Sequence, residues 1–262
     1  TVACELYRHG VPCRVVDAAD GPSPWSKASV LHARTLEIFA QMGIADAAVA
    51  RGQKLRALRA FHRGAGDILH VTMDGLDTPY PYLLGLPQRE TEALLLGNLE
   101  RLGGQVERRL RLVALEQDVR GVTATLHGRD GDHIVRAAFV VACDGSYSMA
   151  RHLLGLPFEG PVYDEVYLQA DAQVRWPGEF PPDEIRAYLG DHGALLCMPT
   201  GEPDVLRLQA PLPAVSDIEP NLETFRRVLA ERGPAGAEIE GLGWSVAFPV
   251  GRRLMPRFRV DR

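Results

Sequence analysis

Residues 138–156 read AFVVACDGSYSMARHLLGL, and this stretch decides the fold class. An apolar, β-branched run over 139–142 predicts a buried strand that stops at Asp144 and Gly145. Small polar residues then lead into a helix-compatible segment that carries Arg151 and ends at a glycine. A helix N-terminus offers unpaired N–H groups and a positive partial charge, so a strand that delivers an acid and a glycine there suits an anionic cofactor. The stretch therefore predicts an α/β protein whose ligand lies beyond the carboxyl end of a strand.

Composition describes an ordinary globular chain. Its 262 residues, 46% hydrophobic and 24% charged, suffice for one large domain or two modest ones. The net charge of -5 argues against nucleic-acid binding, because no basic field dominates. No apolar run approaches the roughly 18 residues that a membrane span needs, and no signal peptide is visible. We therefore expect a cytoplasmic protein without a membrane span.

The cysteines and histidines show no pattern of a disulfide framework or a metal site. No C-x-x-C or H-E-x-x-H motif occurs, so we expect no metal site. The four cysteines are interpreted as reduced, mostly buried thiols: Cys4, Cys13, Cys143 and Cys197.

The two ends of the sequence look like parts of longer elements. Residues 1–9 resemble the later turns of a helix that Gly10 ends, and residues 11–16 form a short strand that leads to Asp17. This is the helix and second strand of a β-α-β unit, so we expect a fragment of a longer protein. The alternative is a small protein with a frayed first helix.

The rest of the pattern indicates two regions. In the first, helices are predicted at 33–42 and 88–102, and strands at 55–62, 68–72, 82–87, 105–117, 121–128 and 133–142. After Gly155, prolines become frequent and a mostly antiparallel region is predicted, with strands at 163–176, 184–190, 193–198, 204–210 and 242–250 and a helix at 221–232. We predict an α/β (α+β) fold: a Rossmann-like domain with an inserted β-meander over 1–157, a β-rich domain over 158–250, and a return to the first domain over 251–262.

Three polar residues stand at the ends of predicted strands. Asp17 occupies the position at which a nucleotide-binding unit places an acid for ribose hydroxyls, although a solvated cap is the alternative. Gln88 lies between a strand and a helix and could be an ordinary first helical residue. Asp144 could simply cap its helix.

The order and context of these pieces resemble a known family. The chain is similar to the single-component, FAD-dependent aromatic hydroxylases, the para-hydroxybenzoate/phenol hydroxylase superfamily of class A flavoprotein monooxygenases. It looks closest to the branch that acts on phenols, hydroxyphenylpropionate and aromatic polyketides. The resemblance covers essentially the whole chain, and its carriers are ACELYRHGVPCRVVD (3–17), SKASVLHARTLEIFAQMGI (26–44), LPQRETEALLLGNLERLG (86–103) and VVACDGSYSMARHLLGL (140–156). The last is the family's Asp-Gly motif, whose acid supports the flavin and the nicotinamide pyrophosphate.

The resemblance implies FAD and NAD(P)H as cofactors and assigns roles residue by residue. Asp17 would bind the adenosine ribose, and Gln88 would touch the ribityl chain. Lys27 and Arg34 would lie along the phosphate and the flavin edge. The site near the pyrophosphates would be ordered by Asp144, Gly145 and Arg151.

Some positions depart from the family pattern. The Gly-x-Gly-x-x-Gly loop expected before Thr1 and the Gly-Asp segment expected after Arg262 are not in this sequence. Asp17 stands where Glu is commoner, and Lys27 stands where Arg is frequent. Tyr147 replaces a frequent Arg or His, which weakens the expected nicotinamide contact. We expect the 262 residues alone to bind FAD poorly and to be inactive.

The implied reaction is hydroxylation of a small aromatic substrate, phenolic or polyketide. NAD(P)H would reduce FAD, and O₂ would form a flavin C4a-hydroperoxide that transfers oxygen to the ring. The second region would supply the pocket, although each candidate could be sheet core only: Tyr188, Leu195, Met198, Pro199, Trp244 and Phe248. No catalytic base is identified beyond the weak candidates His192 and Arg207.

Two other functions stay open. One is a truncated, non-catalytic homologue that binds a ligand without flavin. The other is a related flavin oxidase or dehydrating enzyme that inserts no oxygen. The identity of the substrate, the choice of NADH or NADPH, and the oligomeric state, a homodimer included, are left open as well.

Overall fold

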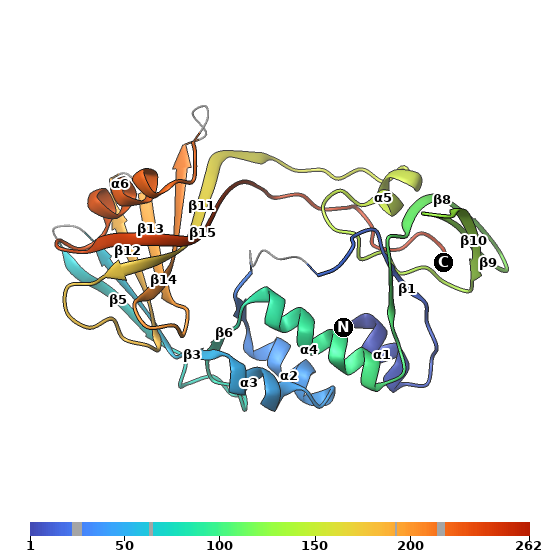
Figure 1. Ribbon diagram of the computed structural model, residues 1–262, viewed down its shortest axis with the longest axis horizontal. Coiled ribbons are helices and arrows are strands. Elements are labelled where there is room, and N and C mark those ends of the chain that lie inside the picture. Colours follow the sequence, from blue (N-terminus) through green and yellow to red (C-terminus); the bar gives the residue numbers. More distant parts are fainter. Residues whose placement is uncertain (23–27, 63–64, 192, 214–217) are drawn as a thin grey trace. The chain divides into compact units, whose positions relative to one another are not determined.

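The chain forms a mixed α/β structure, as the sequence predicts (Figure 1). It divides into two compact units. The computed structural model describes residues 1–22, 28–62, 65–191, 193–213 and 218–262. Unit 1 comprises Thr1–Ser23, Leu96–Val162 and Gly251–Arg262, and unit 2 comprises Pro24–Leu95 and Tyr163–Val250. No helix in the described ranges is long and apolar enough to cross a membrane.

This division differs from the predicted one, which separates 1–157, 158–250 and 251–262. Residues 24–95 group with the second region because β4 (Ala57–His62) pairs in parallel with β12 (Glu184–Gly190). The register runs from Ala57 opposite Glu184 to His62 opposite Leu189. Local sequence patterns cannot reveal a pairing between strands so far apart in the chain.

Unit 1 contains a parallel pair of strands and an antiparallel meander. Helix α1 (Val2–Arg8) is followed by Gly10, whose φ of 72° suits the left-handed conformation after a helix. Strand β1 (Val15–Asp17) pairs in parallel with β7 (Val106–Arg108). The meander has the order β10-β9-β8, formed by β8 (Arg111–Asp118), β9 (Gly121–Gly128) and β10 (Gly131–Ala137). The predicted strand over 105–117 is thus two strands, which are separated at Arg109, where φ is 63°.

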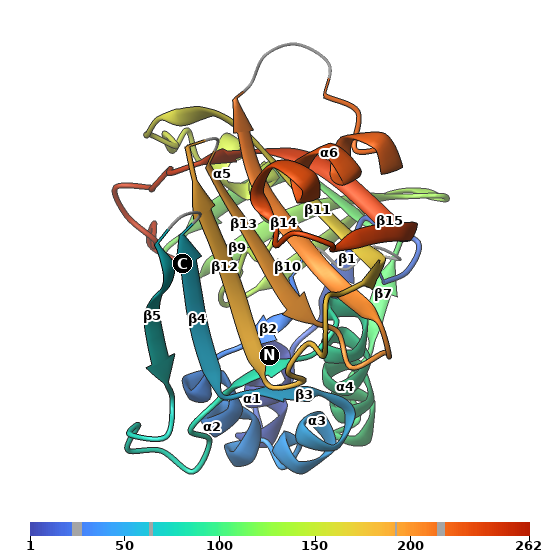
Figure 2. The ribbon, with the colours of Figure 1, turned by 90° about the vertical axis from the view of Figure 1, so that its left-hand side faces the viewer.

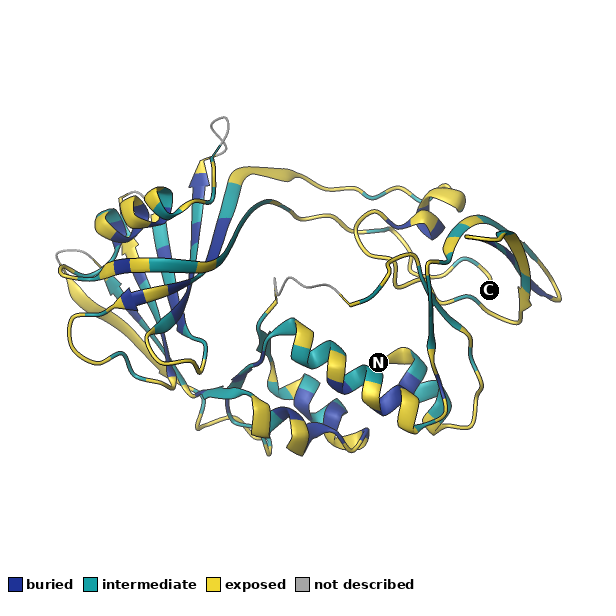
Figure 3. Ribbon diagram, in the orientation of Figure 1, coloured by how far each residue is buried: buried dark blue, intermediate teal, exposed yellow. Residues whose placement is uncertain are grey.

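The prediction of a buried strand over 139–142 is wrong. Strand β10 ends at Ala137, and Phe139 and Val141 are 55% and 60% exposed. In Figure 3, which colours the chain by burial, the segment that leads to the C-terminus is also largely exposed. Val140 donates its backbone N–H to the carbonyl of Arg262, and no strand in the described part of the chain pairs with this run. A strand is buried only where neighbouring elements cover it, so apolar composition alone did not decide the outcome. Helix α5 (Met149–Leu153) follows the run.

Unit 2 begins with helices and a small sheet. Helices α2 (Ala33–Gln41) and α3 (Ala45–Arg51) pack together, and α3 was not predicted. The antiparallel sheet has the order β2-β6-β3, formed by β2 (Val30–Leu31), β6 (Leu83–Gly85) and β3 (Gln53–Leu55). Helix α4 (Gln88–Arg101) starts in unit 2 and continues into unit 1.

A seven-stranded sheet forms most of unit 2 (Figure 2). Its order is β15-β11-β14-β13-β12-β4-β5, and the strands not yet given are β5 (Gly66–Thr72), β11 (Val162–Arg175), β13 (Gly193–Pro199), β14 (Val205–Pro213) and β15 (Glu238–Gly251). Helix α6 (Leu222–Arg232) packs on one face, and its N-cap Asn221 accepts a hydrogen bond from the N–H of Thr224 at 3.0 Å. Since side chains alternate along a strand, the sheet has an inner face toward α6 and an outer face away from it.

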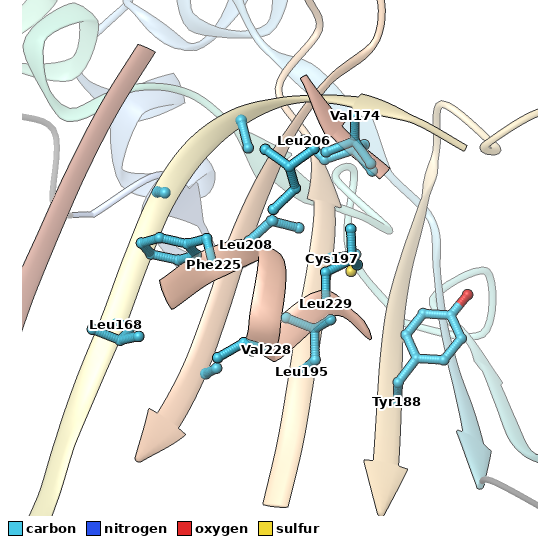
Figure 4. Packing of buried hydrophobic residues seen from close by; sticks show 14 of the residues in the cluster. Leu168, Val174, Tyr188, Leu195, Cys197, Leu206, Leu208, Phe225, Val228 and Leu229 are labelled. Carbon is cyan, nitrogen blue, oxygen red and sulfur yellow. The ribbon is translucent and has the colours of Figure 1, made fainter. Parts of the chain in front are cut away.

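The main core lies between the inner face and α6 (Figure 4). Leu168, Leu195 and Leu208 are fully buried beneath Phe225 and Leu229 of the helix. A smaller cluster on the outer face brings the small sheet against the large one, and it contains Leu55, Ile185 and Met198. The small sheet thus covers part of the outer face near β12 and β13.

Candidate functional site

Asp17 ends the parallel strand β1, as the resemblance requires. Its Oδ2 accepts a hydrogen bond from Nη1 of Arg108 at 2.7 Å, and its Oδ1 accepts one from the N–H of Ala19 at 2.9 Å. The side chain remains 45% exposed. A carboxylate can accept several hydrogen bonds, so Asp17 retains the capacity to accept ribose hydroxyls. Its surroundings fit that role, which stays a prediction.

Asp144 caps the start of α5. Its Oδ2 accepts a hydrogen bond from the N–H of Ala150 at 3.1 Å, and Ser148 at the N-cap accepts one from the N–H of Arg151. Partial burial raises the pKa of Asp144, but hydrogen bonds from the Ser148 hydroxyl and from backbone N–H groups outweigh it and leave the pKa below its usual value. Gly145 has a φ of 76°, which glycine adopts without strain. The structure therefore shows Asp144 bound to the start of α5, which is the alternative that the sequence left open. Cofactor contacts of Asp144 and Gly145 stay predictions.

Arg151 is buried and holds the loop between Asp144 and α5. Its Nη1 donates to the carbonyl of Ser146 at 3.0 Å, and its guanidinium carbon lies 4.5 Å from the centre of the Phe158 ring. Both contacts fix the conformation of this loop, because a planar cation is held at once by an acceptor and by a ring face. The predicted role of Arg151 near the cofactor pyrophosphates stays a prediction.

The other predicted cofactor residues lie in unit 2. Oε1 of Gln88 accepts a hydrogen bond from the N–H of Ala28 at 3.4 Å, and its Nε2 donates to Glu92 at 2.8 Å. Gln88 therefore joins the start of α4 to the segment before β2. Arg34 is exposed and pairs with Glu37 at 2.7 Å. Lys27 lies outside the described residues.

The predicted pocket residues divide between the two faces of the large sheet. Tyr188 and Leu195 belong to the inner core, where Tyr188 stacks on Phe61 with ring centroids 5.1 Å apart. Burial raises the pKa of Tyr188 to about 12. Met198 lies on the outer face, beneath the small sheet. Pro199 ends β13 and lines a pocket of about 650 Å³ at the end of the sheet, with Trp176 and Phe180 among its walls.

Trp244 and Phe248 of β15 are half-buried on the outer face. Phe248 stacks on Tyr167 of β11 with ring centroids 6.3 Å apart. The Trp244 ring centre lies 5.5 Å from the guanidinium carbon of Arg207. Of the six predicted residues, the structure therefore brings Met198, Trp244 and Phe248 to one face.

Sequence reasoning missed an ion pair on this face. Nε and Nη2 of Arg207 each donate to a carboxylate oxygen of Asp171 at 2.7 Å, across the paired strands β14 and β11. Arg207 was considered only as a base, but a guanidinium keeps its proton in proteins and acts as a donor. The sequence does carry a signal for this pair, because Asp171 and Arg207 are each a charged residue between apolar neighbours in a strand of alternating pattern. The other candidate base, His192, lies outside the described residues.

The outer face thus combines flat aromatic side chains with an ion pair between the buried Arg207 and the partly buried Asp171. We define the outer-face patch as Tyr167, Asp171, Arg207, Trp244 and Phe248. Aromatic side chains offer apolar area to a flat ring, and a fixed guanidinium offers a donor to its polar substituents. The chemistry of the patch suits a planar aromatic ligand.

Comparison with known proteins gives a consistent assignment. A family described as an FAD binding domain matches residues 1–227. Rifampicin monooxygenase of Streptomyces venezuelae is 33% identical over 267 residues, which cover 100% of this chain and 54% of that protein. The structure of OxyS anhydrotetracycline hydroxylase from Streptomyces rimosus has a TM-score of 0.76 and 30% identity, over 100% of this chain and 52% of that chain. The structure of the Diels-Alderase PyrE3 of pyrroindomycin biosynthesis has a TM-score of 0.78 and 27% identity, over 100% and 55%.

The chain spans about half the length of the curated relatives it matches. The family match nevertheless covers most of the chain, including the Asp-Gly motif at 144–145. The chain belongs to the FAD-binding domain family of class A flavin monooxygenases.

Proposed function

We propose that the protein of which this chain is part hydroxylates an aromatic substrate, phenolic or polyketide, with FAD, NAD(P)H and O₂. The outer-face patch carries the proposal, because it offers flat apolar surfaces around a fixed hydrogen-bond donor. Similarity to a rifampicin monooxygenase and to an anhydrotetracycline hydroxylase supports it, because both are named for the insertion of oxygen.

When bound, FAD would supply the redox chemistry: NAD(P)H would reduce it so that O₂ can be activated, with one oxygen atom passing to the substrate and the other leaving as water. The residues of this chain would bind and orient the cofactor. The carboxylate of Asp17 would accept hydrogen bonds from the hydroxyl groups of the adenosine ribose, and Gln88 would hold the ribityl chain. Asp144 and Arg151 would keep the Asp-Gly loop in one conformation, while Lys27 and Arg34 would lie along the phosphate and flavin edge.

The outer face would orient the substrate and exclude water. Trp244, Tyr167 and Phe248 would cover the flat faces of the ring and replace its hydration shell. A dry, shaped site limits the loss of a reactive oxidant to water. No residue of the patch is assigned as a base, because the Arg207 guanidinium holds its proton.

The test uses the full-length protein with bound FAD. NAD(P)H and O₂ consumption are followed with a panel of phenols and aromatic polyketides, and products are identified by mass spectrometry. We expect at least one substrate to gain a single oxygen atom. Trp244→Ala should lower kcat/KM about tenfold or more, whereas Val119→Ala, an exposed control in unit 1, should leave it unchanged.

The similarity to PyrE3 favours a second candidate, a flavoprotein that reshapes its substrate without inserting oxygen. In that case the panel would yield isomers, or oxidised products of unchanged oxygen content. A non-catalytic ligand-binding homologue would show neither bound yellow flavin nor NAD(P)H oxidation. Each result would contradict the proposed hydroxylase.

A further inference from the structure

The guanidinium of Arg207 is the most deeply buried charge on the outer face. The residue is 3% exposed, although it lies on the face of the sheet away from the α6 core. Asp171 binds two of its three nitrogens, Nε and Nη2, in a bidentate pair. The planar group is therefore fixed in orientation, which a free arginine side chain is not.

The third nitrogen, Nη1, has no hydrogen-bond partner among the residues that the structure describes, and it is closed to solvent. Its two N–H groups are strong donors. A buried donor left without an acceptor is unfavourable, and proteins satisfy nearly all such groups. The half-buried indole of Trp244 lies over the guanidinium, but a ring face is a weaker partner than an oxygen.

The charge of the pair decides which acceptor suits it. Asp171 neutralises Arg207, so an arriving carboxylate would lose its own hydration and gain no net positive charge in return. Removing a carbonyl or phenolic oxygen from water costs less free energy than removing a carboxylate, and such an oxygen can still accept a hydrogen bond from Nη1. The arrangement therefore favours an uncharged acceptor over an anion.

We propose that Nη1 of Arg207 is the polar anchor of the substrate, that it donates to a ring carbonyl or phenolic oxygen, and that Asp171 makes this anchor selective against carboxylates. The inference rests on the proposed function and names the substrate class within it: neutral, oxygenated aromatic rings. Because Nη1 is closed to solvent, the ligand has to displace the side chains that cover it, and the indole of Trp244, 5.5 Å from the guanidinium carbon, is placed to stack on the incoming ring.

The test measures equilibrium binding to the full-length, oxidised holoenzyme by calorimetry, without NAD(P)H, so turnover is not needed. Three probes of one ring system are compared: a hydroxyanthraquinone, anthracene, which lacks every oxygen, and the hydroxyanthraquinone that carries a carboxylate. We expect the first to bind about tenfold to hundredfold more tightly than either of the others, as a hydrogen bond from a charged donor predicts.

Two variants separate the anchor from the charge. Asp171→Asn leaves Arg207 uncompensated, so the carboxylated probe should gain at least tenfold in affinity. The double variant Arg207→Leu with Asp171→Leu removes the pair as a unit, which proteins tolerate better than the loss of one partner, and it should bind the hydroxyanthraquinone and anthracene equally. Arg175→Gln is the control, since it breaks an exposed ion pair with Glu238 on the same strand β11.

A purely structural ion pair would give a different result. The three probes would then bind alike, or not at all, and Asp171→Asn would not favour the carboxylate; any of these outcomes overturns the proposal. If the double variant fails to fold, the affinity of Asp171→Asn for the carboxylated probe still tests the proposal. Selective binding without hydroxylation of any substrate would contradict the proposed function but keep the anchor, so the two failures are distinguishable.

Discussion

The carboxylate of Asp144 accepts a hydrogen bond from the backbone N–H of Ala150 at 3.1 Å and thereby ties the Asp-Gly turn to the start of α5. The first N–H groups of a helix have no partner within it, so a side chain that accepts from them stabilises the helix. The most family-specific acid in the chain therefore has a structural task that does not depend on any cofactor.

This contact predicts a pH-dependent contribution to stability. The pKa of Asp144 is lower in the folded chain than its usual value, so its contribution is complete above about pH 4 and is lost as the pH falls through the folded pKa. Asp144→Asn keeps an acceptor but removes the charge. The difference in urea midpoint between wild type and Asp144→Asn should be present at pH 7 and should vanish in strong acid. A difference independent of pH would contradict the assignment.

We predict that any side chain at Gly160 strongly destabilises the backbone around it. Its φ is 139°, and an added Cβ would overlap the carbonyl oxygen of Arg252, a backbone atom that cannot turn away. Gly160→Ala should therefore lower the free energy of unfolding by about 3 kcal/mol or more. Gly178→Ala is the matched control, because its φ is also positive but its Cβ would meet no atom within 4 Å. The control should cost about 1 kcal/mol in the same denaturant titration.

The cysteines should differ sharply in reactivity. Cys143 is exposed, whereas Cys197 is fully buried and burial raises its pKa. The thiolate is the reactive form, so brief treatment with iodoacetamide at neutral pH should label Cys143 and leave Cys197 unmodified until the chain is unfolded. Peptide mass spectrometry shows which cysteine is alkylated first, and Cys143→Ser should remove the early label. Early labelling of Cys197 would mean that the inner core opens readily.

Tyr188 predicts a loss of stability in strong base. Burial raises its pKa to about 12, whereas the phenol of an unfolded chain ionises near pH 10. Between these values the unfolded state binds fewer protons than the folded state, so stability falls as the pH rises. Tyr188→Phe should flatten this fall in denaturant titrations above about pH 10. Tyr147→Phe should not change it, because Tyr147 is 92% exposed.

The sequence predicted the elements better than their arrangement. Alternating strands such as β13 and β14, and the helix α6 with its Asn221 cap, follow from local patterns. Helix α3 was missed because its alanine-rich sequence carries little periodic signal. The parallel pairing of β4 with β12 was missed because it is set by distant contacts.

The candidate site was predictable only where a motif marks it. Asp17 ends β1 and Gln88 begins α4, as expected, because strand and helix ends are visible in sequence. Asp144 follows no strand, but it accepts a hydrogen bond from the start of α5. The pair of Asp171 and Arg207 belongs to no motif, since the two residues meet only through the register of β11 and β14. Periodicity could suggest that both face away from the core, but it could not show that they touch.

The pairing of β4 with β12 also bears on how the protein is made. The ribosome releases the β4–β5 hairpin more than a hundred residues before β12, which at ordinary rates of synthesis is a delay of roughly ten seconds. During that interval the nascent hairpin has an unsatisfied edge, and chaperones that bind extended apolar segments can reach it. Assembly of the large sheet is therefore a late event, completed only after β12 has been synthesised.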